Sequence, residues 1–284
     1  MDRTLVTWLV VNARSGSCTP EALAGLEDHF EAHGFTVAHT VRFPDEDLPT
    51  PEALDAADVG MLAVFSGDGT LNAAITDLYG WGGSIVVLPG GTMNLLSHRL
   101  HGDTTCEIIL SRIAAGACRT VRPLVARCEA GDALAGLLVG PGTAWASVRE
   151  AMRDLDVPAL AEETGEAVAR TTSGPGVACV EPQRGRDGGD PLIEFTPCHR
   201  GLQLDAFHAD GAAELIQQTW ALVRRRFREG PHDRLGLFDE VVLESCAGEK
   251  LSILIDGEPA EVPTRATFTV APCEVDLLAT DHGF

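Results

Sequence analysis

Apolar runs of strand length alternate with helical patterns along residues 1–123. The runs are Leu5–Val11, Phe35–Val41, Val59–Phe65 and Ser84–Leu88, and most of their residues are hydrophobic, as in buried strands. Helix starts follow these runs at Thr19, Thr50 and Thr105, the first two continuing as Thr-Pro-Glu. This alternation predicts a doubly wound parallel sheet with helices on both faces and with ligand loops at the carboxyl ends of the strands.

The pattern changes after Pro123. Short β-like runs lie among Gly, Pro and Asp turns, at Leu134–Val139, Gly176–Val180, Leu202–Phe207, Val241–Leu243, Leu251–Ile255 and Thr267–Val270. A longer helix is predicted at about Gly211–Phe227. We therefore expect an α/β nucleotide-binding domain over residues 1–123, to which residues 274–284 return. Residues 124–273 are expected to form a mainly antiparallel β-sandwich that binds the substrate.

Charge and residue counts exclude several classes of protein. The 284 residues include 42 Asp and Glu against 21 Lys and Arg, a net charge of −21, which argues against a nucleic-acid partner. Lys250 is the only lysine and follows no glycine loop, so the chain has neither a Walker A loop nor a protein-kinase lysine. The eight cysteines include no C-x-x-C pair, and no cleavage signal follows Leu5–Val11; both favour a cytoplasmic protein with reduced thiols.

Two glycine turns carry the clearest functional signal. Ser66-Gly67-Asp68-Gly69-Thr70-Leu71-Asn72 follows the third apolar run, and Gly90-Gly91-Thr92-Met93-Asn94 follows the fourth. A tight turn that opens a helix presents main-chain N–H groups to an anion, usually phosphate. A single turn of this kind is more often simple helix capping. Two turns in consecutive strand-to-helix units favour a polyphosphate such as ATP.

Four motifs, in order along the chain, resemble the catalytic domain of the diacylglycerol kinase family. That family includes sphingosine, ceramide and bacterial lipid kinases and is related to NAD kinases and phosphofructokinases. The motifs are Val10-Val11-Asn12-Ala13-Arg14-Ser15-Gly16, the first glycine turn, Leu88-Pro89 with the second glycine turn, and Ile255-Asp256-Gly257-Glu258-Pro259. The resemblance is strong over residues 5–100, good over residues 250–279 and poor over residues 126–200.

The resemblance implies a kinase that uses ATP and Mg²⁺. The nucleotide would be held by Asn12, Ala13, Arg14, Ser15, Gly16, Thr40, Ser66, Gly67, Asp68, Gly69, Thr70, Asn72, Gly91, Thr92 and Asn94. Asp68 would hold the Mg²⁺ that accompanies ATP or orient the acceptor hydroxyl. Glu258 matches the family's catalytic glutamate and would act as general base from the second domain, in a cleft between the domains. By itself, Asp256-Gly257-Glu258 is an ordinary hairpin turn.

Two segments depart from the family pattern. A stretch that reads D-G-x-L-D in the family, beside a structural Mg²⁺, reads His199-Arg200-Gly201-Leu202-Gln203-Leu204-Asp205 here. Arg200 therefore replaces the first acid, and Asp205 alone remains as a doubtful metal ligand. The glycine-rich segment that carries an acid facing the lipid reads Gly140-Pro141-Gly142-Thr143-Ala144-Trp145, without a carboxylate. A different acceptor or weakened activity would follow from these changes.

The sequence therefore predicts a cytoplasmic enzyme that transfers the γ-phosphoryl group of ATP to a diacylglycerol-like lipid alcohol. Two alternatives stay open: a kinase of the same fold for a soluble alcohol, NAD-like or a sugar, and a nucleotide-binding regulator that has lost catalysis. A lipid substrate implies transient membrane contact, for which Trp220–Arg228 is a basic candidate. A core-facing helix is the favoured interpretation of that run, because an acidic protein resists anionic lipid. A homodimer stays open, and His98 and His101 are expected at a helix surface or as caps.

Overall fold

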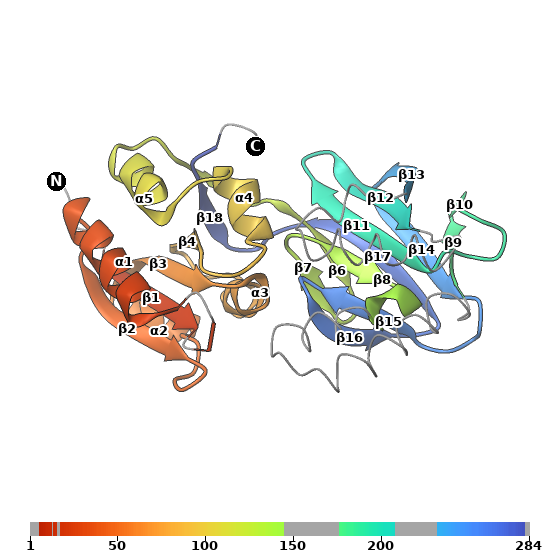
Figure 1. Cartoon of the computed structure of the whole chain (residues 1–284), viewed down its shortest axis with the longest axis horizontal. Helices are drawn as coiled ribbons and strands as arrows, with labels where there is room; N and C mark the ends of the chain where they lie inside the picture. The colour runs from red at the N-terminus through yellow and green to blue at the C-terminus, as the bar shows by residue number, and fades with distance from the viewer. Residues whose placement is uncertain (1–5, 13, 16–17, 145–175, 208–231, 282–284) are drawn as a thin grey trace. The chain divides into compact units, whose positions relative to one another are not determined.

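The computed structural model describes residues 6–12, 14–15, 18–144, 176–207 and 232–281. The chain forms two compact units: unit 1 comprises Met1–Pro123 and Pro272–Phe284, and unit 2 comprises Leu124–Ala271. Unit 2 is therefore inserted into the sequence of unit 1, as the colours of Figure 1 show. The predicted helix at Gly211–Phe227 and the basic run Trp220–Arg228 lie outside the described residues. In the described ranges, no helix has the length and hydrophobicity that crossing a membrane requires.

Unit 1 is built on a six-stranded sheet with the strand order β2-β1-β3-β4-β18-β5. Its strands are β1 (Val6–Asn12), β2 (Val37–Phe43), β3 (Val59–Ser66), β4 (Ser84–Pro89), β5 (Arg119–Val121) and β18 (Asp276–Ala279). β1 pairs in parallel with β2 and β3, and β4 pairs in parallel with β3 and β18. β5 pairs antiparallel with β18. The predicted parallel sheet is confirmed, and β18 completes it from the far end of the chain.

Five helices are described in unit 1: α1 (Pro20–Ala32), α2 (Pro51–Ala56), α3 (Asp68–Thr76), α4 (Leu95–His101) and α5 (Cys106–Ala114). The hydroxyls of Thr19, Thr50 and Thr105 accept main-chain N–H groups at the starts of α1, α2 and α5, as their sequence pattern predicts. Local capping chemistry therefore sets where these helices begin.

Both faces of the unit 1 sheet are covered. On one face, α1 and α5 pack on β1 and β3 through Leu26, Phe30 and Ile109 (Figure 1). Leu62 and Val64 alternate with the β3 residues of that core and are also fully buried, so the opposite face of β3 is covered as well. The glycine turns at the ends of β3 and β4 therefore project from a rigid, two-sided core.

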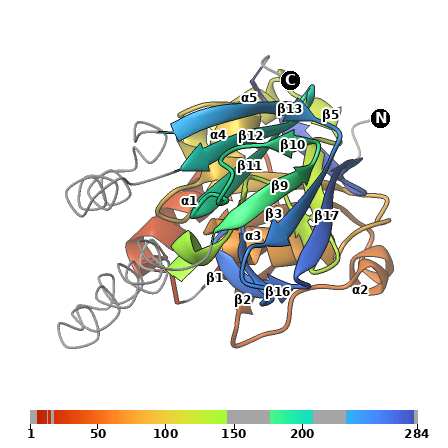
Figure 2. The same ribbon diagram turned by 90° about the vertical axis from the view of Figure 1, so that its right-hand side faces the viewer.

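Unit 2 is a sandwich of two six-stranded antiparallel sheets, ordered β10-β9-β14-β17-β6-β7 and β13-β12-β11-β8-β15-β16 (Figures 1 and 2). The first sheet contains β6 (Leu124–Cys128), β7 (Gly131–Ala133), β9 (Val177–Glu181), β10 (Gln183–Arg184), β14 (Glu240–Ser245) and β17 (Arg265–Pro272). The second contains β8 (Leu137–Val139), β11 (Leu192–Cys198), β12 (Gly201–Phe207), β13 (His232–Phe238), β15 (Leu251–Ile255) and β16 (Glu258–Val262).

One hydrophobic core joins the two sheets of unit 2. Phe195 of β11 and Phe268 of β17 stack across it with ring centroids 4.8 Å apart, and both are fully buried. The predicted antiparallel sandwich is confirmed. Sequence analysis missed β6, β7, β10, β11, β13 and β16. It also expected a continuous strand at Leu134–Val139, where the structure has a break at residues 134–136 followed by β8.

Candidate functional site

The two glycine turns lie side by side at the carboxyl edge of the unit 1 sheet. β3 ends at Ser66 and β4 ends at Pro89, and the parallel register pairs these two residues. Gly90 then donates its N–H to the carbonyl of Ser66 at 3.2 Å. The turns predicted from separate motifs are therefore joined through their main chains.

Only glycine fits where the two turns meet. A Cβ atom on Gly91 would lie 2.5 Å from Cα of Gly67, and one on Gly90 would lie 2.6 Å from the main-chain nitrogen of Ser66. Both distances are shorter than real Cβ contacts. The Gly90-Gly91 pair is therefore required by close main-chain packing.

The loop after β1 is tied to both turns. The Asn12 side chain donates from Nδ2 to the Thr70 hydroxyl at 2.9 Å, and the Ser15 hydroxyl donates to the carbonyl of Gly90 at 2.8 Å. Within the loop, the amide of Arg14 donates to Oδ1 of Asn12 at 2.9 Å. Ala13 and Gly16, which the resemblance implies as nucleotide contacts, lie outside the described residues.

Asp68 joins the first turn to the helix that follows the second. Its two carboxylate oxygens accept the amides of Leu95 and Leu96, each at 3.2 Å, at the first residues of α4. Asn94 precedes α4 with φ 52° and ψ 39°, a left-handed conformation that Asn tolerates, and its Oδ1 accepts the Gly91 amide at 2.7 Å. The Asp68 carboxylate thus acts as a long-range cap for α4, which the sequence pattern did not predict.

Other implied contacts also lie at this edge. Gly67 is the N-cap of α3 and supplies no side chain to its first amides, and Gly69, Thr70 and Asn72 belong to that helix. Ser66 is fully buried, and its hydroxyl donates to the Gly67 carbonyl at 3.1 Å. Thr92 is exposed. Together these residues leave main-chain N–H groups at the start of α3 without a capping side chain.

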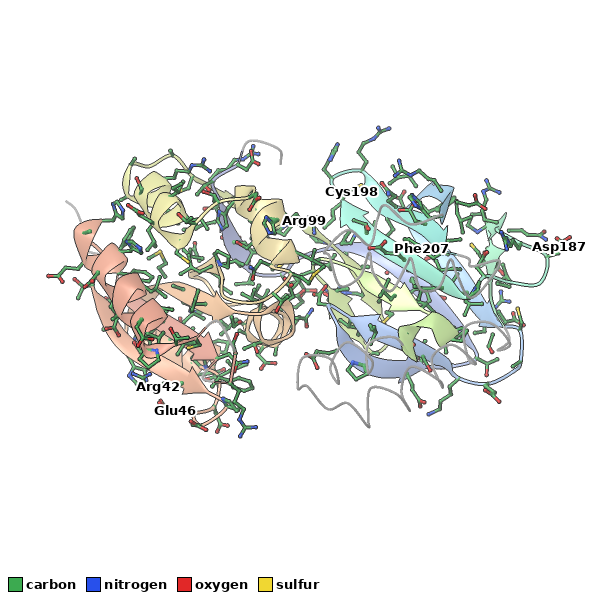
Figure 3. The ribbon with its side chains drawn as sticks, in the orientation of Figure 1. Arg42, Glu46, Arg99, Asp187, Cys198 and Phe207 are labelled. Atoms are coloured by element: carbon green, nitrogen blue, oxygen red, sulfur yellow. The ribbon has the colours of Figure 1, made fainter. Side chains whose placement is uncertain are left out.

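Two arginines lie near this edge. Arg14 is in the loop after β1, and Arg42 pairs with Val11 one residue before the end of β1. Neither side chain forms an ion pair within the described part of the chain. Arg42 lies at the sheet-edge strand, beside the loop that carries Glu46 (Figure 3). Burial raises the pKa of the Cys18 thiol, and the Arg42 guanidinium opposes that rise.

Thr40 is placed differently from the expectation. The predicted strand Phe35–Val41 puts Thr40 near its end, but β2 extends to Phe43, and Thr40 pairs with Leu9. Leu9 is three residues before Asn12, which corresponds to roughly 10 Å along a strand. The structure therefore leaves Thr40 within the sheet, away from the strand ends that carry the turns.

Asp205 has partners that leave it a poor metal ligand. Its side chain is buried in β12, where Oδ2 accepts Nε2 of Gln203 at 2.6 Å and Oδ1 accepts Nε of Arg234 at 3.3 Å. A guanidinium therefore neutralises this carboxylate. No cluster of three or more His, Cys, Asp or Glu residues with metal-binding geometry occurs among the described residues. The chain's residues at this position do not fit a structural Mg²⁺.

Glu258 lies in unit 2, at the first residue of β16. It pairs with Ile255 across a hairpin whose two loop residues, Asp256 and Gly257, have φ of 49° and 97°. Two consecutive positive φ values are typical of a type I′ turn, for which Asp-Gly is a favoured sequence. The Glu258 side chain is exposed and forms no hydrogen bond or ion pair with any residue that the structure describes. Its assignment as general base stays a prediction.

The histidines after the second turn differ from each other. His98 is exposed, with Nδ1 3.8 Å from Asp103, as expected. His101 is 1% exposed, so the expected surface position was wrong; its Nδ1 lies 3.0 Å from the Thr280 hydroxyl. Burial, reinforced by the nearby Arg112, lowers the pKa of His101 to about 4, although Asp281 opposes this shift.

Sequence analysis assigned no role to Asp256 or Arg42. Asp256 accepts main-chain amides about 120 residues away, and no local pattern predicts that contact. Arg42 has a weak sequence signal, because an arginine near the end of the second strand is conspicuous in a half of the chain that contains no lysine.

Comparison with known proteins agrees with this geometry. Residues 6–125 match the family model of the diacylglycerol kinase catalytic domain. A solved structure described as a diacylglycerol kinase from Bacillus anthracis str. Sterne is similar, with 14% identity, full coverage of both chains and a TM-score of 0.61.

Two further structures from the same organism, described as candidate diacylglycerol kinases, have TM-scores of 0.60. One is 16% identical over 98% of this chain and 96% of its own. The other is 17% identical over 98% of both chains. Among curated proteins, none matches this chain significantly.

At such identities the solved structures establish the fold, while the family model covers the segment that contains both glycine turns. The resemblance of the sequence motifs is thereby confirmed: residues 6–125 match the diacylglycerol kinase catalytic domain, within the two-domain fold of those proteins.

Proposed function

We propose that this protein transfers the γ-phosphoryl group of ATP to a hydroxyl of a diacylglycerol-like lipid. The observation that supports this most directly is the main-chain packing of the two glycine turns, with Asn12 and Ser15 fixing the loop beside them. This arrangement lies inside the segment that matches the kinase domain.

The nucleotide would be bound mainly by main-chain groups. The first amides of α3 have no acceptor within the helix, and Gly67 offers them no side chain, so they suit phosphate oxygens. Because residues 1–123 contain no lysine, Arg14 and Arg42 would supply the positive charge on this side of the site. Thr92, exposed after the second turn, would add a hydroxyl donor.

Asp68 fits a Mg²⁺ that is shared with nucleotide phosphates. Mg²⁺ in such sites is held by one or two carboxylates together with phosphate oxygens and water. A carboxylate oxygen can accept more than one partner, so the cap on Leu95 and Leu96 is compatible with this role. When bound, the ion would neutralise charge on the phosphates.

In the transfer step, Glu258 would accept a proton. Its carboxylate would take the proton of the acceptor hydroxyl while that oxygen forms a bond to the γ-phosphorus. The bond from the γ-phosphorus to the bridging oxygen would break, and ADP would leave with that electron pair. The main-chain amides at the turns would stabilise negative charge on the transferred group.

The experiment is incubation of the purified protein with labelled ATP and Mg²⁺ in the presence of separate acceptors. Diacylglycerol, ceramide and sphingosine in mixed micelles would be compared with NAD, glucose and a nucleoside. Label in diacylglycerol supports the proposal. If label appears only in a soluble alcohol, that alcohol would replace the lipid as the proposed acceptor. Calorimetric binding of ADP with no labelled acceptor would indicate a nucleotide-binding regulator instead.

Role assignments are tested by Asp68→Asn and Glu258→Gln. Glu258→Gln is expected to reduce transfer by at least about a hundredfold, the usual range for loss of a proton-transferring group. Asp68→Asn is expected to reduce transfer as well, because it removes the charge that would hold Mg²⁺. ATP binding should persist in both variants. Unchanged turnover in both variants would overturn the assigned roles.

A further inference from the structure

Asp256 uses its carboxylate to hold a distant segment of unit 2. Its Oδ2 accepts the Leu134 amide at 2.8 Å, and its Oδ1 accepts the amides of Ala135 and Gly136, both at 2.9 Å. The main-chain N–H of Asp256 also donates to the carbonyl of Gly136 at 3.0 Å. Four hydrogen bonds thus join the loop of the β15–β16 hairpin to the connection between β7 and β8.

These contacts explain an irregularity in the fold. Residues 134–136 interrupt the strand that the sequence predicts there, because their amides are occupied by a side chain instead of a neighbouring strand. Asp256 itself has φ 49°, a conformation that costs a non-glycine residue energy and is tolerated best by Asn and Asp. A carboxylate that accepts several N–H groups is held firmly, since each of these bonds is charge-assisted.

We infer that Asp256 is a positioning residue for Glu258, and this inference rests on the proposed function. Glu258 begins β16 immediately after the two-residue loop, and its side chain has no hydrogen bond of its own in the described part of unit 2. The orientation of its main chain is therefore set by the hairpin, and the hairpin loop is fixed by Asp256. Loss of this anchor would let the loop shift and would misplace the Glu258 carboxylate relative to the acceptor hydroxyl.

The geometry predicts that Asp256→Asn lowers kcat less than Asp256→Ala does. In Asp256→Asn the remaining Oδ1 can still accept Ala135 and Gly136, while the new NH₂ group faces the Leu134 N–H. In Asp256→Ala all three side-chain bonds are lost. Because displacement of a catalytic group by about 1 Å can cost about a hundredfold in rate, we expect kcat to fall about tenfold in Asp256→Asn and about a hundredfold in Asp256→Ala. The nucleotide contacts belong to unit 1, so the KM for ATP should stay within about twofold.

Asp58 offers a matched control. It is also an aspartate with a left-handed main chain, φ 52°, but it is exposed and its side chain has no hydrogen bond among the described residues. Asp58→Asn should leave kcat within about twofold of the parent. Thermal unfolding of each variant would be recorded, and Asp256→Asn serves as the test if Asp256→Ala does not fold.

The deciding experiment is a double-mutant cycle with Glu258→Gln, measured in single turnovers. If Asp256 acts through Glu258, Asp256→Asn should change the residual rate of Glu258→Gln by less than about twofold. Wild-type kcat in Asp256→Asn, or a tenfold loss that persists in the Glu258→Gln background, would overturn the inference. Full activity in Glu258→Gln would also overturn the inference, because Glu258 would then have no role for Asp256 to support. Absence of transfer in the parent protein would instead refute the proposed function.

Discussion

The side chain of Asn12 donates a 2.9 Å hydrogen bond to the hydroxyl of Thr70, across 58 positions of sequence. The bond links the end of β1 to the first turn of α3, so it fixes the loop that borders the glycine turns. Both residues were expected at the nucleotide site, but the sequence did not indicate that they contact each other.

Breaking this bond from either side should weaken nucleotide binding. Thr70→Val removes only this bond with little change in volume and should lower the affinity for Mg-ADP by about tenfold, corresponding to a lost hydrogen bond at a partly buried site. Asn12→Leu also removes the bond from the Arg14 amide and should lower the affinity by at least as much. The double variant should be no weaker than Asn12→Leu, as titration calorimetry can show. Additive losses would mean that the two side chains act separately.

A methyl group at the meeting point of the two turns should separate them. Gly91→Ala places Cβ 2.5 Å from Cα of Gly67, and the resulting displacement should cost about 1–3 kcal/mol of unfolding free energy and abolish ADP binding. Gly82→Ala is the control, because nothing lies within 4 Å of the added atom. Denaturant unfolding and calorimetry would measure both effects. Equal stability of the two variants would contradict the close packing.

Arg42 should act on phosphate through its charge. Arg42→Gln is expected to lower the affinity for ADP about fivefold at low salt, with a smaller loss at high salt, because exposed charges are screened. Adenosine binding should not change, since it carries no phosphate. Arg200 also forms no ion pair with a described residue but lies in unit 2, so Arg200→Gln should behave like the parent. Equal losses in the two variants would indicate a general charge effect.

His101 should make unit 1 less stable in acid. Its pKa is lowered to about 4 in the folded protein, from 6.5 for the exposed side chain, so the unfolded chain binds the proton more tightly. The folded state therefore loses stability as the pH falls from about 6.5 towards 4, by up to about 3 kcal/mol. Urea unfolding at pH 7.5 and 4.5 would measure this loss, and His101→Gln should reduce the difference. An unchanged difference would assign the acid sensitivity to other groups.

Much of the fold was predicted from interactions between residues that are close in the sequence. The hydroxyl caps at Thr19, Thr50 and Thr105 act within a few residues, so the sequence displays them directly. Strand boundaries were less accurate, because they depend on tertiary pairing. Because β2 extends to Phe43, Thr40 lies three residues before the end of this edge strand and not at its end.

The candidate site was predicted as a set of residue types, without their long-range contacts. Asp68 was recognised as a charged residue on a phosphate turn, but its bonds to α4 depend on how two separate motifs pack. Asp205 likewise accepts a hydrogen bond from Arg234, which lies on β13, a strand that sequence analysis did not identify. Such pairings arise from the assembled sheets, and a single sequence does not display them.

The position of β18 affects how the protein is made. This strand fills the place between β4 and β5, yet the ribosome synthesises it only after the whole of residues 124–271. While unit 2 is being translated, the edge of β4 has no neighbour on that side, and an open apolar strand edge invites pairing with other chains. The edge of β4 therefore stays unpaired on that side until the final strand of the chain emerges.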